Sequence, residues 1–177
     1  GMILKTIGVV LLSLIVHFVF SKVGLMFAIP FGFASSIWPA AGVTLGLYLI
    51  YGRGVLIGSF VGYLLAVSSS GFNLNITSIS ALTIPFWLGA AAIAQLIVTK
   101  QILHRFVPLP VESAKLSNIV KFLIVVGPIS CLTASTIGAS VLSIVGDLTF
   151  QESLFTWAIW WVGDLTGVVF FTPLVLF

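Results

Sequence analysis

A single carboxylate, Asp164, is the only charged residue in the last apolar segment of the chain, which runs from Leu154 to Phe177. An ionised Asp near the middle of a membrane span costs ~2.5–3.5 kcal/mol, so we expect Asp164 to face the protein interior and to have a partner there. A ligand-binding Asp and a structural Asp, hydrogen-bonded to Thr or Trp groups of neighbouring helices, both fit this pattern. The residue therefore indicates a buried polar site without identifying what binds.

Tryptophans accumulate on the same segment. In an α-helix Trp157, Trp161 and Asp164 fall at i, i+4 and i+7, which is one face. Trp157 lies near the predicted outer membrane surface, where aromatic residues commonly anchor helices. Trp160 and Trp161 lie about one turn deeper. Indoles at that depth can form the walls of a cavity in which the carboxylate is the acceptor.

A second group of candidates lies at the outer end of another predicted helix, where two serines precede Trp38 and Pro39. This order predicts a serine N-cap with Pro39 in the first turn of the helix. Thr44, further along the same helix, should lie at a depth similar to that of Asp164. A contact between the Thr44 hydroxyl and the Asp164 carboxylate is therefore one expectation.

The other reactive side chains form no catalytic or metal-binding pattern. His17 lies in the first apolar segment, where a hydrogen-bonded core or lipid-boundary histidine is expected, and His104 lies among basic residues. Cys131 lies in an apolar run and is expected to be a packing residue. Two His and one Cys far apart do not have zinc-site spacing, and nucleophile elbows, phosphate loops and paired carboxylates are missing from the sequence. We predict no enzymatic activity, no metal and no cofactor for this chain.

The composition places these residues in a membrane. Of the 177 residues 60% are hydrophobic and 6% are charged, whereas soluble domains carry about 25% charged residues. The mean hydropathy is +1.29. The seven basic residues are spread along the chain and make no patch for nucleic acid, so the lipid bilayer is the expected partner.

Crossing ~30 Å of hydrocarbon takes about 20 apolar residues in a helix. The sequence therefore predicts an all-α integral membrane protein, a bundle of about six transmembrane helices. Residues 22–33 are expected to be irregular, 68–75 a polar loop and 100–117 a charged linker. The predicted spans are 3–21, 34–51, 55–70, 78–99, 118–144 and 153–176.

The basic residues also predict the orientation, because cytoplasmic loops are enriched in Lys and Arg. A cytoplasmic N-terminus leaves only Lys22 outside and puts the other six basic residues inside: Lys5, Arg53, Lys100, Arg105, Lys115 and Lys121.

Small residues recur four positions apart within the predicted spans, which lets helix backbones approach closely in a membrane. We expect these stripes to pack the bundle. They are Gly42 and Gly46; Gly54, Gly58 and Gly62; Ser130, Ala134 and Gly138; and Gly163 and Gly167.

Two stretches of the chain resemble the first membrane-associated sensor (MASE type 1) family. They are residues 33–42, FASSIWPAAG, and residues 160–167, WWVGDLTG, which is the more specific of the two. The resemblance spans nearly the whole chain in the expected order. One departure is that the family's usual Trp-Pro-Pro reads Trp38-Pro39-Ala40 here.

The resemblance implies a multi-pass input module of the bacterial inner membrane, which precedes cytoplasmic histidine kinases, diguanylate cyclases or cyclic-di-GMP phosphodiesterases. Members of the family commonly continue with about two further spans. We therefore expect residues 1–177 to be a single transmembrane sensory domain, truncated before further helices and a cytoplasmic output domain.

The leading hypothesis is a sensor in which an unknown small molecule, a lipid component or a partner membrane protein binds within the bundle and favours one of two helix arrangements. A substrate-binding membrane subunit of a vitamin-type uptake transporter is the alternative. A structural anchor that forms a homodimer through the glycine stripes is the third reading. The predicted site residues are Asp164, Trp161, Trp160, Trp38, Pro39, Thr44 and Trp157.

Overall fold

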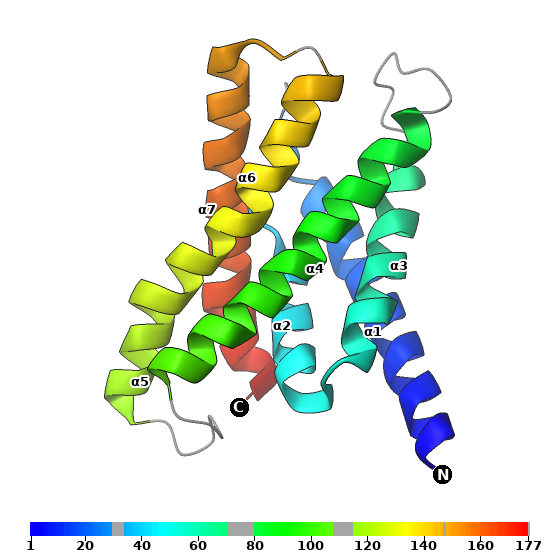
Figure 1. Cartoon of the computed structure of the whole chain (residues 1–177), viewed down its shortest axis with the longest axis vertical. Helices are drawn as coiled ribbons and strands as arrows, with labels where there is room; N and C mark the ends of the chain where they lie inside the picture. Colours follow the sequence, from blue (N-terminus) through cyan, green and yellow to red (C-terminus); the bar gives the residue numbers. More distant parts are fainter. Residues whose placement is uncertain (30–33, 71–79, 108–114, 147, 177) are drawn as a thin grey trace.

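The computed structural model describes residues 1–29, 34–70, 80–107, 115–146 and 148–176. Within 80–107, side chains are described from residue 83 onward. The described residues form helices connected by short turns (Figure 1). The helices are α1 (Met2–Leu25), α2 (Pro39–Tyr51), α3 (Gly54–Ser68), α4 (Ser80–Phe106), α5 (Leu116–Lys121), the π-helix η2 (Phe122–Val126), α6 (Gly127–Val145) and α7 (Phe150–Leu176).

The all-helical prediction is confirmed for the described residues. Four stretches are long and apolar enough to cross a bilayer: Met2–Leu25, Thr83–Phe106, Leu116–Val145 and Phe150–Leu176. Helices α2 and α3 are also apolar but have only 13 and 15 residues, so each is about 20 Å long and does not span ~30 Å alone. A count of six complete spans therefore stays a prediction.

Three predicted boundaries are wrong. In the predicted span 34–51 the helix begins only at Pro39, because residues 34–38 are not helical and Ser35 pairs with Ala28 in an isolated antiparallel bridge. Helix α1 extends to Leu25, into the stretch expected to be irregular. Helix α4 continues to Phe106, through much of the expected linker 100–117, because residues 101–107 contain no Pro or Gly and the next proline is at position 108. Most of the expected loop 68–75 lies outside the described residues.

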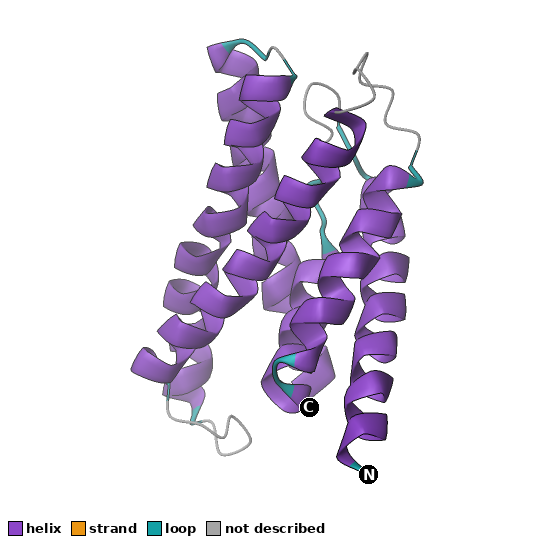
Figure 2. Ribbon diagram, turned by 45° about the vertical axis from the view of Figure 1, so that its right-hand side comes forward, coloured by secondary structure: helices purple, strands orange, loops and turns teal. Residues whose placement is uncertain are grey.

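Helix α2 occupies the centre of the bundle. It contacts α7, α1, α3 and α4, while α1 packs on α3 and α6 packs on both α4 and α7. Figures 1 and 2 show α2 between the α1–α3 pair and the α6–α7 pair, with α4 crossing in front. The central position explains why α2, despite its short length, has many buried residues, from Pro39 to Tyr48.

The outside of the bundle is apolar along its length, as a lipid-facing surface should be. On α1 the exposed side chains recur at intervals of four residues: Ile3, Ile7, Leu11, Ile15, Val19 and Val23.

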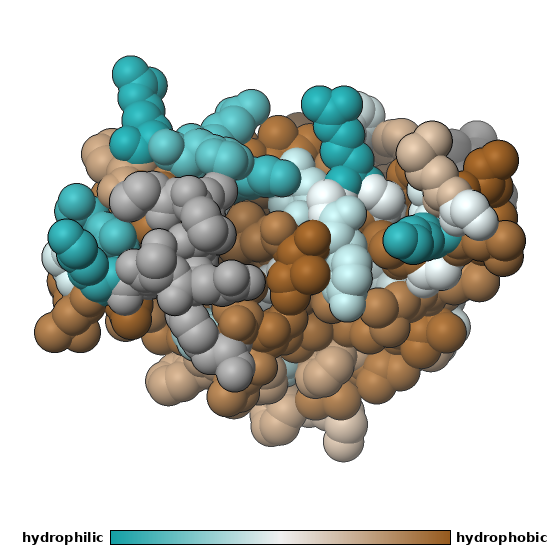
Figure 3. All heavy atoms as spheres, turned by 90° about the horizontal axis from the view of Figure 1, so that it is seen from below, coloured by the Kyte–Doolittle hydropathy of each residue, from teal (hydrophilic) through white to brown (hydrophobic). Residues whose placement is uncertain are grey.

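The two chain ends lie at the same end of the bundle (Figure 1). Hydrophilic side chains gather on this face (Figure 3). The predicted split of charges agrees with the helix order, since Lys5 begins α1, Arg53 joins α2 to α3, and Lys22 lies at the opposite end of α1. The side of the membrane on which each end lies stays a prediction.

Candidate functional site

The two sequence stretches that contain Trp38 and Asp164 meet in backbone contact. The Trp38 N–H donates to the Gly163 carbonyl at 3.1 Å, and the Thr172 hydroxyl donates to the Gly42 carbonyl at 2.9 Å. A Cβ atom at Gly163 would overlap the carbonyl oxygen of Ser35. The glycines of this contact therefore pack α2 against α7, as the small-residue stripes predict.

Pro39 lies at the first position of α2, as predicted. The expected serine N-cap is wrong, because Trp38 is the N-cap residue and makes no side-chain capping bond. The Ser35 hydroxyl instead donates to the Ile37 carbonyl at 2.7 Å. This bond lies within the non-helical segment before α2, whose Ser35 carbonyl lies against Gly163.

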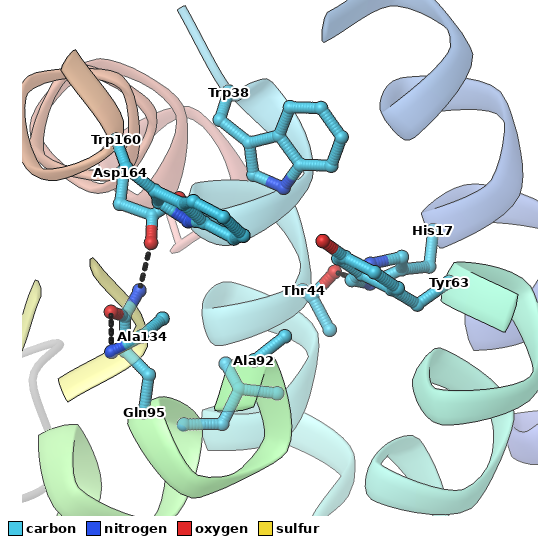
Figure 4. Close-up of a pocket in the computed structure, with 11 residues that line it drawn as sticks. His17, Trp38, Thr44, Tyr63, Ala92, Gln95, Ala134, Trp160 and Asp164 are labelled. Carbon is cyan, nitrogen blue, oxygen red and sulfur yellow. Dashed lines mark hydrogen bonds between the residues drawn. The ribbon is translucent and has the colours of Figure 1, made fainter. Parts of the chain in front are cut away.

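Asp164 faces the interior, as predicted, with 2% of its surface exposed. Its Oδ2 accepts a hydrogen bond from Gln95 Nε2 on α4 at 3.0 Å. The Gln95 Oε1 accepts the backbone N–H of Ala134 on α6 at 3.2 Å, which fixes the orientation of the amide. The Trp160 indole lies beside the same carboxyl group (Figure 4). The Gln95 amide thus connects Asp164 on α7 to α4 and α6.

No cation compensates this carboxylate. All seven Lys and Arg side chains belong to the part of the chain that the structure describes, and none forms an ion pair with Asp164. Its partners are the neutral groups of Gln95 and Trp160. A buried carboxylate in this situation must take up a proton or a cationic guest.

A second polar pair lies across from Asp164. His17 Nδ1 on α1 is hydrogen-bonded to the Thr44 hydroxyl on α2 at 2.9 Å, so His17 is the hydrogen-bonded core histidine that the sequence predicted. The Thr44 hydroxyl therefore bonds to His17 and not to Asp164. The other ring nitrogen, His17 Nε2, is buried without a partner. The Tyr63 ring lies against His17, with centroids 5.6 Å apart, and against Trp38, at 6.1 Å.

A small cavity separates the His17 pair from Asp164 (Figure 4). Its volume is about 20 Å³, which is room for about one water molecule. Helices α1, α3, α4, α6 and α7 contribute to its wall, together with α2 and its N-cap Trp38. The residues that line this central cavity are His17, Trp38, Ala41, Thr44, Tyr63, Ala92, Gln95, Leu96, Ala134, Trp160 and Asp164.

Four of the seven predicted site residues line the central cavity: Trp38, Thr44, Trp160 and Asp164. Their role in binding stays a prediction. His17, Tyr63 and Gln95 were not predicted as site residues. The only sequence signal for Gln95 is one amide in an apolar segment.

The other three predicted residues do not line the cavity. Trp161 donates its N–H to the Pro128 carbonyl at 2.9 Å, and Trp157 donates to the Thr136 hydroxyl at 3.1 Å, so both indoles contact α6. Their rings stack with an interplanar angle of 8°. Pro39 is buried at the start of α2. These three residues pack helices of the bundle against one another and do not line the cavity.

The wall of the cavity mixes polar and aromatic groups. It combines one carboxylate, one imidazole and a phenol with two indoles. A metal ion usually needs a denser donor set, and the described residues contain no cluster of three or more His, Cys, Asp or Glu side chains that could hold one.

The comparisons with known proteins identify a family. The family model MASE1 matches residues 9–177, which is nearly the whole chain and includes every residue of the central cavity. No curated protein and no solved structure matches the chain.

Proposed function

The chain belongs to the MASE1 family of membrane-associated sensory domains, and we propose that it is the sensory input domain of a bacterial signalling protein with a histidine kinase or cyclic-di-GMP output. In this proposal the domain lies in the inner membrane with its N-terminus in the cytoplasm. A small molecule or a membrane partner is recognised at the central cavity, and the output domain responds to the resulting change in helix packing.

The observation that carries the proposal is the position of the cavity. Helices α1, α2, α3, α4, α6 and α7 all have residues in its wall. A guest in the cavity therefore lies between residues of all these helices. A ligand shifts a conformational equilibrium only through its different affinity for the two states, and a cavity shared by many helices changes shape whenever any of them moves.

The ends of the bundle are suited to transmit such a change. Helix α7 has Asp164 near its middle and runs on to Leu176, near the chain end. The contact of Gly42 with Gly167 couples α7 tightly to the central helix α2. Movement at the cavity therefore reaches the C-terminal end of the bundle through one continuous helix.

The size of the cavity argues against a vitamin-sized ligand in this conformation. Sites for drug-sized molecules usually enclose about 300–1,000 Å³, whereas the central cavity has about 20 Å³. A transporter subunit of this type would have to open widely before its substrate could enter. A sensor for a very small guest needs no such opening.

The test is the output activity of the signalling protein that carries this domain, measured at equal membrane levels for each variant. Asp164→Asn and Tyr63→Phe change groups in the cavity wall and should remove or lock the response. Two variants serve as controls. Glu152→Gln removes the charge of a side chain that lies at the start of α7 and is hydrogen-bonded to Thr149. Trp161→Phe removes the indole N–H that donates to the Pro128 carbonyl. Both controls should respond as wild type.

A wild-type response from Asp164→Asn and Tyr63→Phe would refute sensing at this cavity. The loss of response in all four variants would instead indicate that the fold, and not the site, controls the output.

A further inference from the structure

The groups around the central cavity identify the chemical class of guest that suits it. We propose that the cavity binds a small ammonium-type cation, with the ammonium ion itself as the best fit. This inference rests on the proposed function, since it names the ligand class for the same site.

The first argument is charge. The Asp164 carboxylate is buried with neutral partners only, and all seven basic side chains of the protein lie elsewhere. Buried charges are normally paired. A monovalent cation beside Asp164 would supply the countercharge that the ionised carboxylate lacks.

The second argument is hydrogen bonding. Gln95 and Trp160 are the hydrogen-bond partners of the Asp164 carboxylate, and two donors leave acceptor capacity on its two oxygens. When the His17 hydrogen is on Nδ1, that nitrogen donates to Thr44, and the unpartnered Nε2 has a free lone pair. The phenolic oxygen of Tyr63 points into the cavity in Figure 4. These groups are acceptors for the four N–H donors of an ammonium ion.

The third argument is the aromatic wall. The rings of Trp38 and Tyr63 lie 6.1 Å apart, and Trp160 completes the wall beside Asp164. Aromatic faces attract ammonium-type cations through the ring quadrupole. An alkali-metal cation or Mg²⁺ would require a shell of oxygen ligands. The side-chain oxygens of the wall belong to Asp164, Tyr63, Thr44 and Gln95, and those of Thr44 and Gln95 are already bonded to His17 and Ala134.

The fourth argument is size. A cavity of about 20 Å³ holds one water-sized guest, and an ammonium ion is of that size. Added methyl groups should therefore weaken binding stepwise, in contrast to the larger aromatic cages that select methylated ammonium groups.

The experiment uses the purified 177-residue chain in lipid nanodiscs, with ammonium chloride exchanged for sodium chloride at constant ionic strength. Binding is followed by tryptophan fluorescence, since Trp38 and Trp160 line the cavity, and by the unfolding temperature, which rises when a ligand binds the folded state. Methylammonium, tetramethylammonium and potassium chlorides are the comparison salts. Potassium has the same charge and a similar size but no N–H donors.

The expected result is a saturable response to ammonium, a weaker one to methylammonium, and none to tetramethylammonium or potassium. Asp164→Asn should abolish the response. Tyr63→Phe should weaken binding about tenfold, as expected for loss of one hydrogen bond to a charged group. Glu152→Gln should leave the affinity unchanged, because Glu152 bonds to Thr149 and does not line the cavity.

An equal response to potassium, or a saturable ammonium response that persists in Asp164→Asn, would overturn the inference. Two failures remain distinguishable. Signalling that depends on Asp164 without ammonium binding would refute the ligand class alone. Ammonium binding with wild-type signalling from Asp164→Asn would refute the proposed function.

Discussion

The amide of Gln95 is hydrogen-bonded to the carboxylate of Asp164, with 3.0 Å between Nε2 and Oδ2, although the two residues are 69 positions apart in the chain. The same amide accepts the backbone N–H of Ala134. A neutral side chain with one donor and one acceptor in use thus connects helices α4, α6 and α7. It also leaves the ionised form of Asp164 without a countercharge, and this is why we assign the recognition site to the cavity beside it.

Gly163→Ala should destabilise the bundle. The added methyl group would overlap the Ser35 carbonyl oxygen, and overpacking costs about 1–3 kcal/mol. Gly8→Ala is the matched control, because nothing lies within 4 Å of a Cβ at that position and alanine favours the helix. Thermal unfolding in detergent measures both variants. Equal unfolding temperatures for the two variants would contradict the backbone contact between α7 and the segment before α2.

Thr44→Val should destabilise the protein by about 1 kcal/mol, because it replaces the hydroxyl with a methyl group of similar shape and leaves His17 Nδ1 buried without its partner. Thr6→Val is the control, since the Thr6 hydroxyl is exposed and bonds only to the Met2 carbonyl of its own helix. Chemical or thermal unfolding of the two variants gives the difference. If Thr6→Val were the more harmful change, the His17–Thr44 pair would not be structural.

Single cysteines should report the orientation of the bundle. The native Cys131 is buried and can first be replaced by Ala. Lys22→Cys should react in intact cells with a maleimide that does not cross membranes, because Lys22 is predicted to be outside. Arg53→Cys, in the exposed turn between α2 and α3, should react only after the cells are opened. The reverse pattern would place the N-terminus outside.

The sequence was sufficient to predict features that depend on local chemistry. A lone charge in an apolar segment must turn inward, and Asp164 does so. A proline is favoured in the first turn of a helix, and Pro39 occupies the first position of α2, although Trp38 and not a serine is its N-cap. Glycines spaced by four predict close helix packing, and Gly42 and Gly167 meet in backbone contact.

Features that depend on which helices are neighbours were not predictable. On a helix, Trp160 and Trp161 lie about 40° and 60° to either side of Asp164, so both fit a shared face equally well. Packing decides between them, because α6 receives the indole N–H of Trp161 whereas Trp160 lines the cavity. Gln95 was missed for the same reason, since spacing along α4 does not reveal contact with α7.

The most direct test of the account is a double-mutant cycle between Gln95 and Asp164. The free energies of unfolding in detergent are measured for wild type, Gln95→Leu, Asp164→Leu and the double variant. A control cycle uses Gln101→Leu in place of Gln95→Leu, because Gln101 is an exposed residue on α4. The account predicts a coupling of about 1–2 kcal/mol for the Gln95 cycle, as for a charge-assisted bond in a bundle, and about zero for the Gln101 cycle. A Gln95 cycle with no coupling would contradict a carboxylate held inside the bundle beside the cavity.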